Sequence, residues 1–212
     1  MINIKTFVFN SFEVNSFVLY DETLECIIID PGCHSDEEKE MLLRFIEEKK
    51  LKPVILLNTH FHIDHILGNH FVCNRYNLKP TGHAAGSMFW RTAREFGSVF
   101  NLKIDDVVKT ELFVADGDQI TVGKSLLEVR YTPGHADGSI CLVSHLQKFI
   151  IAGDVLFYGS IGRTDLPTGD FDTLMDSIKT KLWVLEDDYI VYPGHGPKTS
   201  IGFEKINNPF IL

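Results

Sequence analysis

An apolar run that ends in a cluster of histidines constrains this chain more than any other feature. PVILLN at residues 53–58 has the length and composition of a buried strand. THFHIDH follows it directly, at residues 59–65. His60 and His62 are two residues apart, so on an extended strand end both side chains point the same way and can reach one ion. Asp64 and His65 lie beyond the turn, where a helix is expected to begin, and can serve a second ion. The segment therefore predicts two ligands for each of two metals.

Three further candidate ligands occupy the same setting, at or just past the end of an apolar strand. They are His135 in VRYTPGHADGS, Asp154 in KFIIAGDVLF and His195 in YIVYPGHGPK. A Pro-Gly turn twice stops the strand and lets the histidine project from the sheet edge. Gly153 permits a close approach to the site, and the carboxylate of Asp154 can bridge two ions. The other four histidines are predicted to be ordinary surface or hydrogen-bonded side chains: His34, His70, His83 and His145.

Strands and helices alternate along both halves of the chain. Residues 4–10, 14–20 and 24–30 are expected to form an antiparallel meander, followed by a helix over 35–50. Ser35 and Glu38 form a capping box at its start, acids crowd the first turn and lysines the last, and its apolar face is expected to comprise Met41, Leu42, Phe45 and Ile46. In the second half, strands are expected at 125–131, 139–144, 148–153 and 189–192, with a helix over 171–185. The pattern predicts one domain over residues 1–212, an α/β (α+β) protein built as an αββα sandwich.

The segment 79–110 breaks this alternation. Its core, AAGSMFWRTAREFGSVFNL, predicts a helix whose bulky face carries Phe89, Phe96 and Phe100. A helical insert after the ligand loop can be a lid over the site or a plain packing helix, and the sequence favours neither.

Charge and composition exclude several classes of partner. The formal net charge is −9 and no Lys/Arg cluster is present, which disfavours nucleic acid. No apolar stretch is long enough to cross a bilayer, and the first residues lack the apolar region of a secretory signal, so a cytoplasmic protein with a small-molecule substrate is expected. The four cysteines form no CxxC pair and are predicted to be reduced, core-filling residues. These patterns do not define an oligomeric state.

Four segments together resemble a known family over nearly the full chain. THFHIDH, TPGHADG, AGDVLF and YPGHGP are similar, in order and character, to the metal motifs of the metallo-β-lactamase-fold hydrolases. The resemblance implies that fold, with one divalent ion held by His60, His62 and His135, a second by Asp64, His65 and His195, and Asp154 bridging them. It implies Zn²⁺ most directly, with Fe or Mn as alternatives. A metal-bound hydroxide would then attack a carbonyl carbon, and Asp64 would orient it.

Within that family, the chain is similar to small bacterial members of the glyoxalase II-like group. TPGHADGSICLV and GDVLFYGSIGRTDLPTGDF carry this likeness, which implies hydrolysis of a thioester such as S-lactoylglutathione. The chain ends at NNPFIL, soon after His195, so the helical C-terminal domain that helps such enzymes to hold glutathione is expected to be absent. The thiol half of the substrate is then expected to contact Tyr158, Arg163, Phe96 and Phe100.

Three other functions remain to be weighed against thioester hydrolysis. The persulfide dioxygenase branch shares the fold and a GRTD segment like residues 162–165, but it uses one iron held by two histidines and an aspartate. In that segment, Arg163 and Asp165 are expected to form an ion pair that fixes the loop after Asp154, in preference to a substrate contact. Phosphodiester hydrolysis is disfavoured by the acidic charge and the missing RNA-binding insert. A structural zinc site is disfavoured because such sites are rich in thiolates and this one has no cysteine ligand.

Overall fold

Strands with apolar side chains on both faces form the centre of the molecule. The computed structural model describes residues 1–99, 102, 104 and 106–211. In β2 (Val14–Tyr20) and β3 (Glu25–Ile29), Phe17 and Ile27 lie in a core cluster between two sheets, whereas Val18 and Ile28 lie in another cluster with helix residues. Because successive residues of a strand point to opposite faces, both faces of this sheet are covered.

The first sheet combines an antiparallel and a parallel part. Its strand order is β1-β2-β3-β4-β5-β6, and β1 to β3 form the predicted antiparallel meander. The strands from β3 to β6 pair in parallel, which requires crossover connections. The remaining elements of this half are β1 (Asn3–Phe9), α1 (Asp36–Glu48), β4 (Lys52–Leu57), α2 (Ile63–Ile66), α3 (Asn69–Tyr76), β5 (Pro80–His83), α4 (Ser87–Val99) and β6 (Leu112–Val114).

The second sheet has the order β14-β13-β10-β9-β8-β7. Only the pair of β10 and β13 is parallel among its described pairs. A separate two-stranded hairpin, β11–β12, follows β10. The elements of this half are β7 (Gln119–Val122), β8 (Ser125–Tyr131), β9 (Ile140–Ser144), β10 (Phe149–Gly153), β11 (Leu156–Phe157), β12 (Ser160–Ile161), α5 (Phe171–Ser177), β13 (Ile190–Pro193), β14 (Thr199–Ser200) and α6 (Ile201–Asn207).

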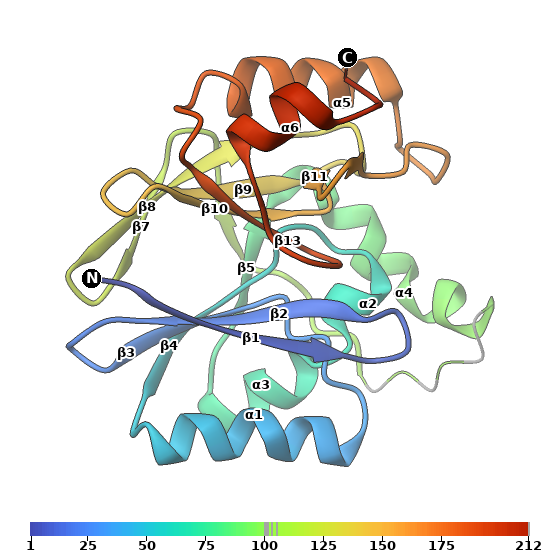
Figure 1. The fold of residues 1–212 in the computed structure, drawn as a ribbon. Coiled ribbons are helices and arrows are strands. Elements are labelled where there is room, and N and C mark those ends of the chain that lie inside the picture. Colours follow the sequence, from blue (N-terminus) through green and yellow to red (C-terminus); the bar gives the residue numbers. More distant parts are fainter. Residues whose placement is uncertain (100–101, 103, 105, 212) are drawn as a thin grey trace.

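The two sheets lie face to face between two layers of helices (Figure 1). Helices α1 and α3 cover the outer face of the first sheet, and α5 and α6 cover the outer face of the second. The core between the sheets is contributed by both, for example by Leu57 of β4 and Ile151 of β10. The predicted αββα sandwich is confirmed.

Helix α1 begins as predicted and ends earlier than predicted. Ser35 accepts a hydrogen bond from the Glu38 N–H, and the Glu38 side chain accepts one from the Ser35 N–H, so the capping box is present. The helix stops at Glu48, and the two lysines expected in its last turn follow it, because the chain turns at Lys50 with φ +55° to enter β4. Met41 is half exposed, so the expected apolar face is reduced to Leu42, Phe45 and Ile46.

Two other helices differ from the sequence expectation. The helix expected over 171–185 is α-helical only to Ser177 and continues as one π turn at Ile178–Leu182, which places Ile178 and Leu182 in the core against the second sheet. Helix α6 was not predicted. The helix expected over 84–102 is a short 3₁₀ turn at Ala84–Gly86 followed by α4. Phe100 lies outside the described residues.

Helix α4 packs onto α2 at one end of the two sheets (Figure 1). Phe89 is buried and Ala93 joins it in a cluster with Ile63 and Ile66 of α2. These are the contacts of a packing helix, and they do not test whether the segment 79–110 moves as a lid. That role, like the single domain over residues 1–212, stays a prediction.

The four cysteines are buried and unpaired in the described chain. Burial raises the pKa of Cys26, Cys33 and Cys141 to about 12, so these thiols stay protonated at neutral pH. This agrees with the predicted role as core-filling residues. Over the described residues, the structure contains no helix with the length and apolar character needed to span a membrane.

Candidate metal centre

The end of β4 places the first group of candidate ligands. After Leu57 the chain leaves the sheet, and the Thr59 N–H donates to the Asp30 carboxylate at 2.7 Å. His62 is extended (φ −62°, ψ 150°) and forms the N-cap of α2, so Asp64 and His65 already lie on the helix. The rings of His60 and His65 are nevertheless close, with centroids 4.1 Å apart, so the residues before and after this turn face one site.

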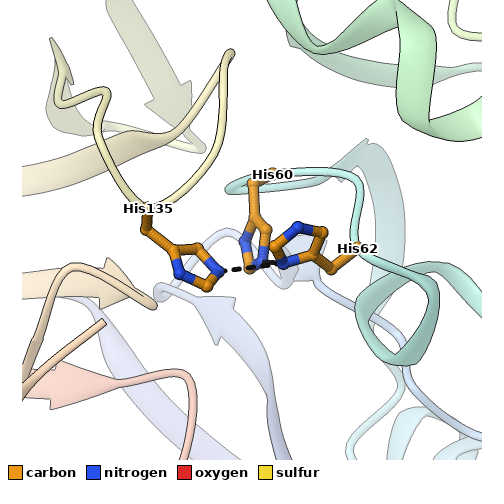
Figure 2. A group of neighbouring side chains, drawn as sticks. All are labelled: His60, His62 and His135. Carbon is orange, nitrogen blue, oxygen red and sulfur yellow. Dashed lines mark hydrogen bonds between the residues drawn. The ribbon is translucent and has the colours of Figure 1, made fainter. Parts of the chain in front are cut away.

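Three histidines from two loops meet at one point (Figure 2). The His62 Nδ1 lies 3.2 Å from the His60 Nε2 and 2.9 Å from the His135 Nε2. His60 and His62 come from the loop after β4, and His135 comes from the loop after β8. Nitrogen ligands at ~2.0–2.1 Å from a tetrahedral ion lie about 3.3 Å apart. The spacing of these three nitrogens therefore suits one such ion.

A second group forms beside the first. The His195 Nε2 lies 3.1 Å from the Asp64 Oδ2, and the His65 Nε2 lies 3.5 Å from the same oxygen. The potential ligand atoms of Asp64, His65 and His195 all lie within 4.8 Å of one another. One carboxylate and two imidazoles form a set that zinc and other divalent transition metals accept.

Asp154 lies between the two groups. Its Oδ1 is 3.4 Å from the His65 Nε2, and its Oδ2 is 3.6 Å from the His135 Nε2 and 3.5 Å from the His195 Nε2. The carboxylate thus reaches a histidine of each group at once. The structure therefore gathers all seven residues of the predicted ligand set.

The outer nitrogens of four histidines are held by the protein. The His65 Nδ1–H donates to the Asp30 Oδ2 at 3.0 Å, and the His60 Nδ1 lies 3.2 Å from the Thr59 Oγ1. The His135 Nδ1 and the His195 Nδ1 donate to the backbone carbonyls of Arg163 and Phe12, at 2.8 and 2.9 Å. In metal sites, a histidine ligand commonly donates its other ring N–H to a protein oxygen, which fixes the orientation of the ring. Here the hydrogen bonds at Nδ1 direct the Nε2 atoms of these rings towards the centre of the site.

Sequence reasoning did not identify Asp30 as part of this arrangement. Its carboxylate accepts from the Thr59 N–H and hydroxyl as well as from His65, and it is fully buried. In the sequence, Asp30 ends the strand predicted over residues 24–30 and precedes Pro31 and Gly32. The available signal was a carboxylate at the end of an apolar strand, the same setting as that of Asp154.

Burial lowers the pKa of His60 and His62, whereas neighbouring carboxylates outweigh burial and raise the pKa of His65 and His195. Burial lowers the pKa of His62 to about 3 and the pKa of His60 well below its usual value, so both rings are neutral at pH 7. Burial opposes ionisation of Asp64, but His65 and His195 outweigh it and lower the pKa of its carboxyl. Neutral imidazoles and ionised carboxylates are the protonation states that bind divalent metals.

Unpartnered polar atoms provide an independent test of the fit to a metal. The His65 Nε2 and the Asp154 Oδ1 are buried and make no hydrogen bond of good geometry in the described chain; they lie 3.4 Å from each other at the centre of the site. Such atoms are costly unless a ligand, ion or water satisfies them. The residues present therefore fit a centre for divalent metal ions.

Two glycines let the chain come this close. A Cβ on Gly194 would overlap the Asp154 Oδ1 and lie 2.9 Å from the His65 Cε1. Gly153 has φ +50°, and a Cβ there would lie 2.5 Å from the Thr59 Oγ1. The absence of a Cβ at Gly153 therefore leaves room for the Thr59 side chain, and the absence of one at Gly194 leaves room for the Asp154 carboxylate.

A cavity of about 420 Å³ opens onto these groups. Phe96 and Arg163, two of the expected substrate contacts, line it. Tyr158 is 54% exposed, its ring stacks on Phe203, and it is not among the described lining residues, so the structure gives its expected contact no support. The lining also includes apolar residues that sequence reasoning missed: Phe12, Ile63, Phe157, Ile161 and Leu166.

Arg163 has a second role that the sequence predicted. Its guanidinium pairs with both carboxylate oxygens of Asp165, each at 2.7 Å, so the ion pair expected within the GRTD segment is present. The Arg163 carbonyl also accepts from His135. The loop after Asp154 is thereby tied to one of the candidate ligands.

The remaining histidines stand apart from the site, as expected. His83 stacks on Tyr131, His145 contacts Glu128 and Tyr189, and His70 contacts Asn74. Within the described residues, neither these three nor His34 belongs to a group of possible metal ligands.

Comparison with known proteins gives the same picture of the fold. The model of the metallo-beta-lactamase superfamily matches residues 10–195. Hydroxyacylglutathione hydrolase GloC of Haemophilus influenzae is 36% identical over 99% of this chain and 98% of its own.

Three solved structures resemble the chain over nearly its whole length. The BLEG-1 B3 metallo-beta-lactamase has a TM-score of 0.90 at 31% identity, covering 99% of this chain and 100% of its own. A di-iron-bound form of TTHA1623 has a TM-score of 0.86 at 28% identity, covering 97% and 99%. ETHE1 from Myxococcus xanthus has a TM-score of 0.79 at 28% identity, covering 98% and 83%.

Proposed function

Because the chain belongs to the metallo-β-lactamase superfamily, we propose that it is a dinuclear metal-dependent hydrolase that cleaves thioesters such as S-lactoylglutathione. The observation that carries the proposal is the convergence of seven ligand-type side chains on one cavity. The relative named a hydroxyacylglutathione hydrolase, which matches almost the entire chain, supports the substrate class.

The seven residues would hold two divalent ions. His60, His62 and His135 would hold one, Asp64, His65 and His195 the other, and Asp154 would contact both. Zn²⁺ suits this set of nitrogen and oxygen ligands, and Fe or Mn is the alternative, supported by the di-iron form of a similar protein. Such ions, when bound, supply a water of lowered pKa and stabilise the oxyanion that forms on a carbonyl.

The protein groups around the centre would position the reactants. Asp64 is the proposed catalytic residue: its carboxyl has a lowered pKa, so it is ionised at neutral pH and can orient the attacking water by accepting a hydrogen bond from it. The apolar walls formed by Phe12, Phe96 and Leu166 would exclude bulk water and pack against the acyl and methylene parts of a small substrate.

Arg163 is the proposed contact for a carboxylate of the thiol half. Its side chain lines the cavity and is 60% exposed, but Asp165 already occupies one edge of its guanidinium. Its contribution to affinity is therefore expected to be modest. Phe96 is a proposed apolar contact. Phe100 and Tyr158, expected from the sequence, receive no support from the described structure.

A persulfide dioxygenase with a single iron is the alternative function. The likeness to ETHE1 fits it. The presence of a second group, Asp64, His65 and His195, favours the dinuclear hydrolase, because a single iron held by two histidines and an aspartate does not require it.

One experiment separates these functions. The purified protein, loaded in turn with Zn²⁺, Mn²⁺ and Fe²⁺, is assayed for hydrolysis of S-lactoylglutathione and for oxygen uptake with glutathione persulfide, and its metal content is measured in parallel. Thioester hydrolysis with nearly two metals per chain is expected. Oxygen uptake with one iron would establish the alternative, and no reaction with either substrate would reject the proposed substrate class.

Asp154→Ala tests the shared ligand. Loss of the carboxylate that reaches both groups is expected to remove about one metal per chain and to reduce hydrolysis by more than about 100-fold. Elemental analysis and steady-state kinetics measure the two effects. Cys73→Ser, at a buried thiol remote from the centre, is the control that should keep both metals and activity. Two metals and full activity in Asp154→Ala would show that the bridge is assigned to the wrong residue.

A further inference from the structure

The β11–β12 hairpin forms one wall of the cavity. Phe157, Ser160 and Ile161 line it, and the ring of Phe157 lies 6.3 Å from the ring of His195, centroid to centroid. The hairpin pairs only Leu156 with Ile161 and Phe157 with Ser160. A hairpin with so few backbone pairs is not stable by itself. The position of this cavity wall therefore depends on the contacts between the hairpin and the rest of the protein.

A buried carboxylate on the C-terminal helix α6 supports the turn of this hairpin. Glu204 has no exposed surface. The Gly159 N–H donates to both of its oxygens, each at 3.1 Å, and the Thr199 hydroxyl and the Asn208 amide donate at 2.5 and 2.7 Å. A buried charge is tolerated only where hydrogen bonds replace its hydration, and here one of these donors is the backbone of the hairpin.

Asn208, the C-cap residue that follows α6, holds the next position of the hairpin. It is also fully buried, and its Nδ2 donates to the Ser160 carbonyl at 3.0 Å as well as to Glu204. In addition to these hydrogen bonds, the ring of Tyr158 stacks on the ring of Phe203 in α6, with 4.9 Å between the ring centroids. Three consecutive residues of the turn, Tyr158, Gly159 and Ser160, are thus tied to one helix.

We propose that Glu204 and Asn208 are positioning residues that hold the β11–β12 hairpin as a fixed wall of the substrate cavity and thereby set substrate affinity. The inference rests on the proposed function only in taking this cavity as the place where substrate binds. Neither residue lines the cavity, so both act through the hairpin. A hairpin released from α6 would have to be ordered by the substrate, which costs binding free energy.

Two variants and a matched control test the affinity effect. Glu204→Gln places an amide N–H among groups that all donate, and Asn208→Ala removes the bond to the Ser160 carbonyl. Each is expected to raise KM for the thioester about tenfold, with kcat within about twofold and metal content unchanged. Thr199→Val is the control, because it removes a donor to the same carboxylate without touching the hairpin. It is expected to lower stability and leave KM unchanged.

The kinetic result can contradict the proposal in two ways. An unchanged KM in folded Glu204→Gln and Asn208→Ala would overturn it, and so would an equal rise of KM in Thr199→Val. Because the first two sites are buried, a variant can fail to fold, and a measurement on the unmodified protein is needed as well.

Hydrogen exchange of the unmodified protein provides that measurement. The Gly159 amide lies in a surface turn, yet its bond to buried Glu204 predicts strong protection from exchange. Exchange at the rate of an unprotected amide would overturn the proposal, whatever the substrate is. If the protein hydrolyses no thioester, the proposed function fails, and the exchange rate still decides whether α6 holds the hairpin.

Discussion

Asp30 lies behind the candidate metal centre and orients one of its ligands. Its Oδ2 accepts from the His65 Nδ1–H, and the same carboxylate accepts from the N–H and hydroxyl of Thr59. The ring of His65 therefore has one orientation, with Nε2 directed at Asp64 and Asp154. Replacing a carboxylate that orients a metal-binding histidine usually lowers metal affinity or activity by about 10–100-fold.

Asp30→Asn should weaken the second metal position. An amide in this place keeps one acceptor and brings its own N–H groups against the donors of His65 and Thr59, so the ring loses its fixed orientation. We expect metal affinity at the group of Asp64, His65 and His195 to fall ~10–100-fold, measured by competition with a chelator. The control is Asp21→Asn, which alters an equally buried carboxylate remote from the site. Equal affinity in both variants would contradict the role of Asp30.

The convergence of the candidate ligands could be predicted from the sequence because their residue types and their positions at strand ends agree. His60, His135 and His195 each follow an apolar strand, and the fold collects such strand ends at one edge. Residues that act through shape were not predictable in this way. Phe12 and Leu166 line the cavity, but in the sequence nothing distinguishes them from other apolar loop residues. Tyr158 was expected at the substrate because it follows Asp154 closely, yet its ring lies on Phe203.

At the scale of elements, the turn after β13 brings His195 and the Asp154 carboxylate together. Gly194 is the tightest point of this turn, since a Cβ there would overlap the Asp154 Oδ1. Gly194→Ala should therefore displace the carboxylate and reduce metal content towards one ion per chain or less, measured by elemental analysis. Two bound metals in this variant would show that the turn has room that the structure does not indicate.

Gly196→Ala is the matched control two residues further on. A Cβ at this position meets nothing within 4 Å, but the backbone has φ +73°, which is unfavourable for alanine. We expect a loss of about 1 kcal/mol in the free energy of unfolding and no loss of metal, measured by denaturant unfolding and elemental analysis. A large loss of metal here would mean that any disturbance of this turn removes metal, whether or not a Cβ overlaps the Asp154 carboxylate.

Elements marked by an apolar run or a clear cap were predicted, and several short elements without such a mark were not. The apolar runs of β2, β3 and β10 and the capping box of α1 are evident in the sequence. Helix α6 has only seven residues, too few for a periodic pattern, although Ser200 caps it as an N-cap serine should. The π turn at Ile178–Leu182 places Ile178 and Leu182 in the core, and helix propensity alone cannot reveal that requirement.

At the scale of the whole molecule, Asp21 connects the two sheets. It lies at the end of β2, is 1% exposed, and accepts from the N–H of Lys124 at 2.8 Å and the hydroxyl of Ser125 at 3.2 Å in the turn between β7 and β8. Thr23 donates to it from its own turn. Burial alone would raise the pKa of this carboxyl, but the hydrogen bonds outweigh burial and lower the pKa to about 2.

This pKa predicts an acid-dependent contribution to stability. The folded value lies below the ordinary value of 3.8, so the ionised carboxylate stabilises the fold above that pH, and the contribution disappears as pH falls towards 2. Asp21→Asn should lower the free energy of unfolding by about 1–3 kcal/mol at pH 7, and the difference from the unmodified protein should shrink between about pH 4 and 2. Urea unfolding at several pH values measures this, and a difference independent of pH would contradict it.

The candidate ligands are divided between the two halves of the sandwich. Four of them follow β4 of the first sheet, and His135, Asp154 and His195 follow strands of the second. Each of the two groups of three combines residues of the first half with a histidine of the second, so ions bound there would act as cross-links between the sheets. By mass action, an ion at about 100 times its dissociation constant adds ~2.7 kcal/mol to the folded state. The metal concentration would then set the stability of the folded chain as well as its activity.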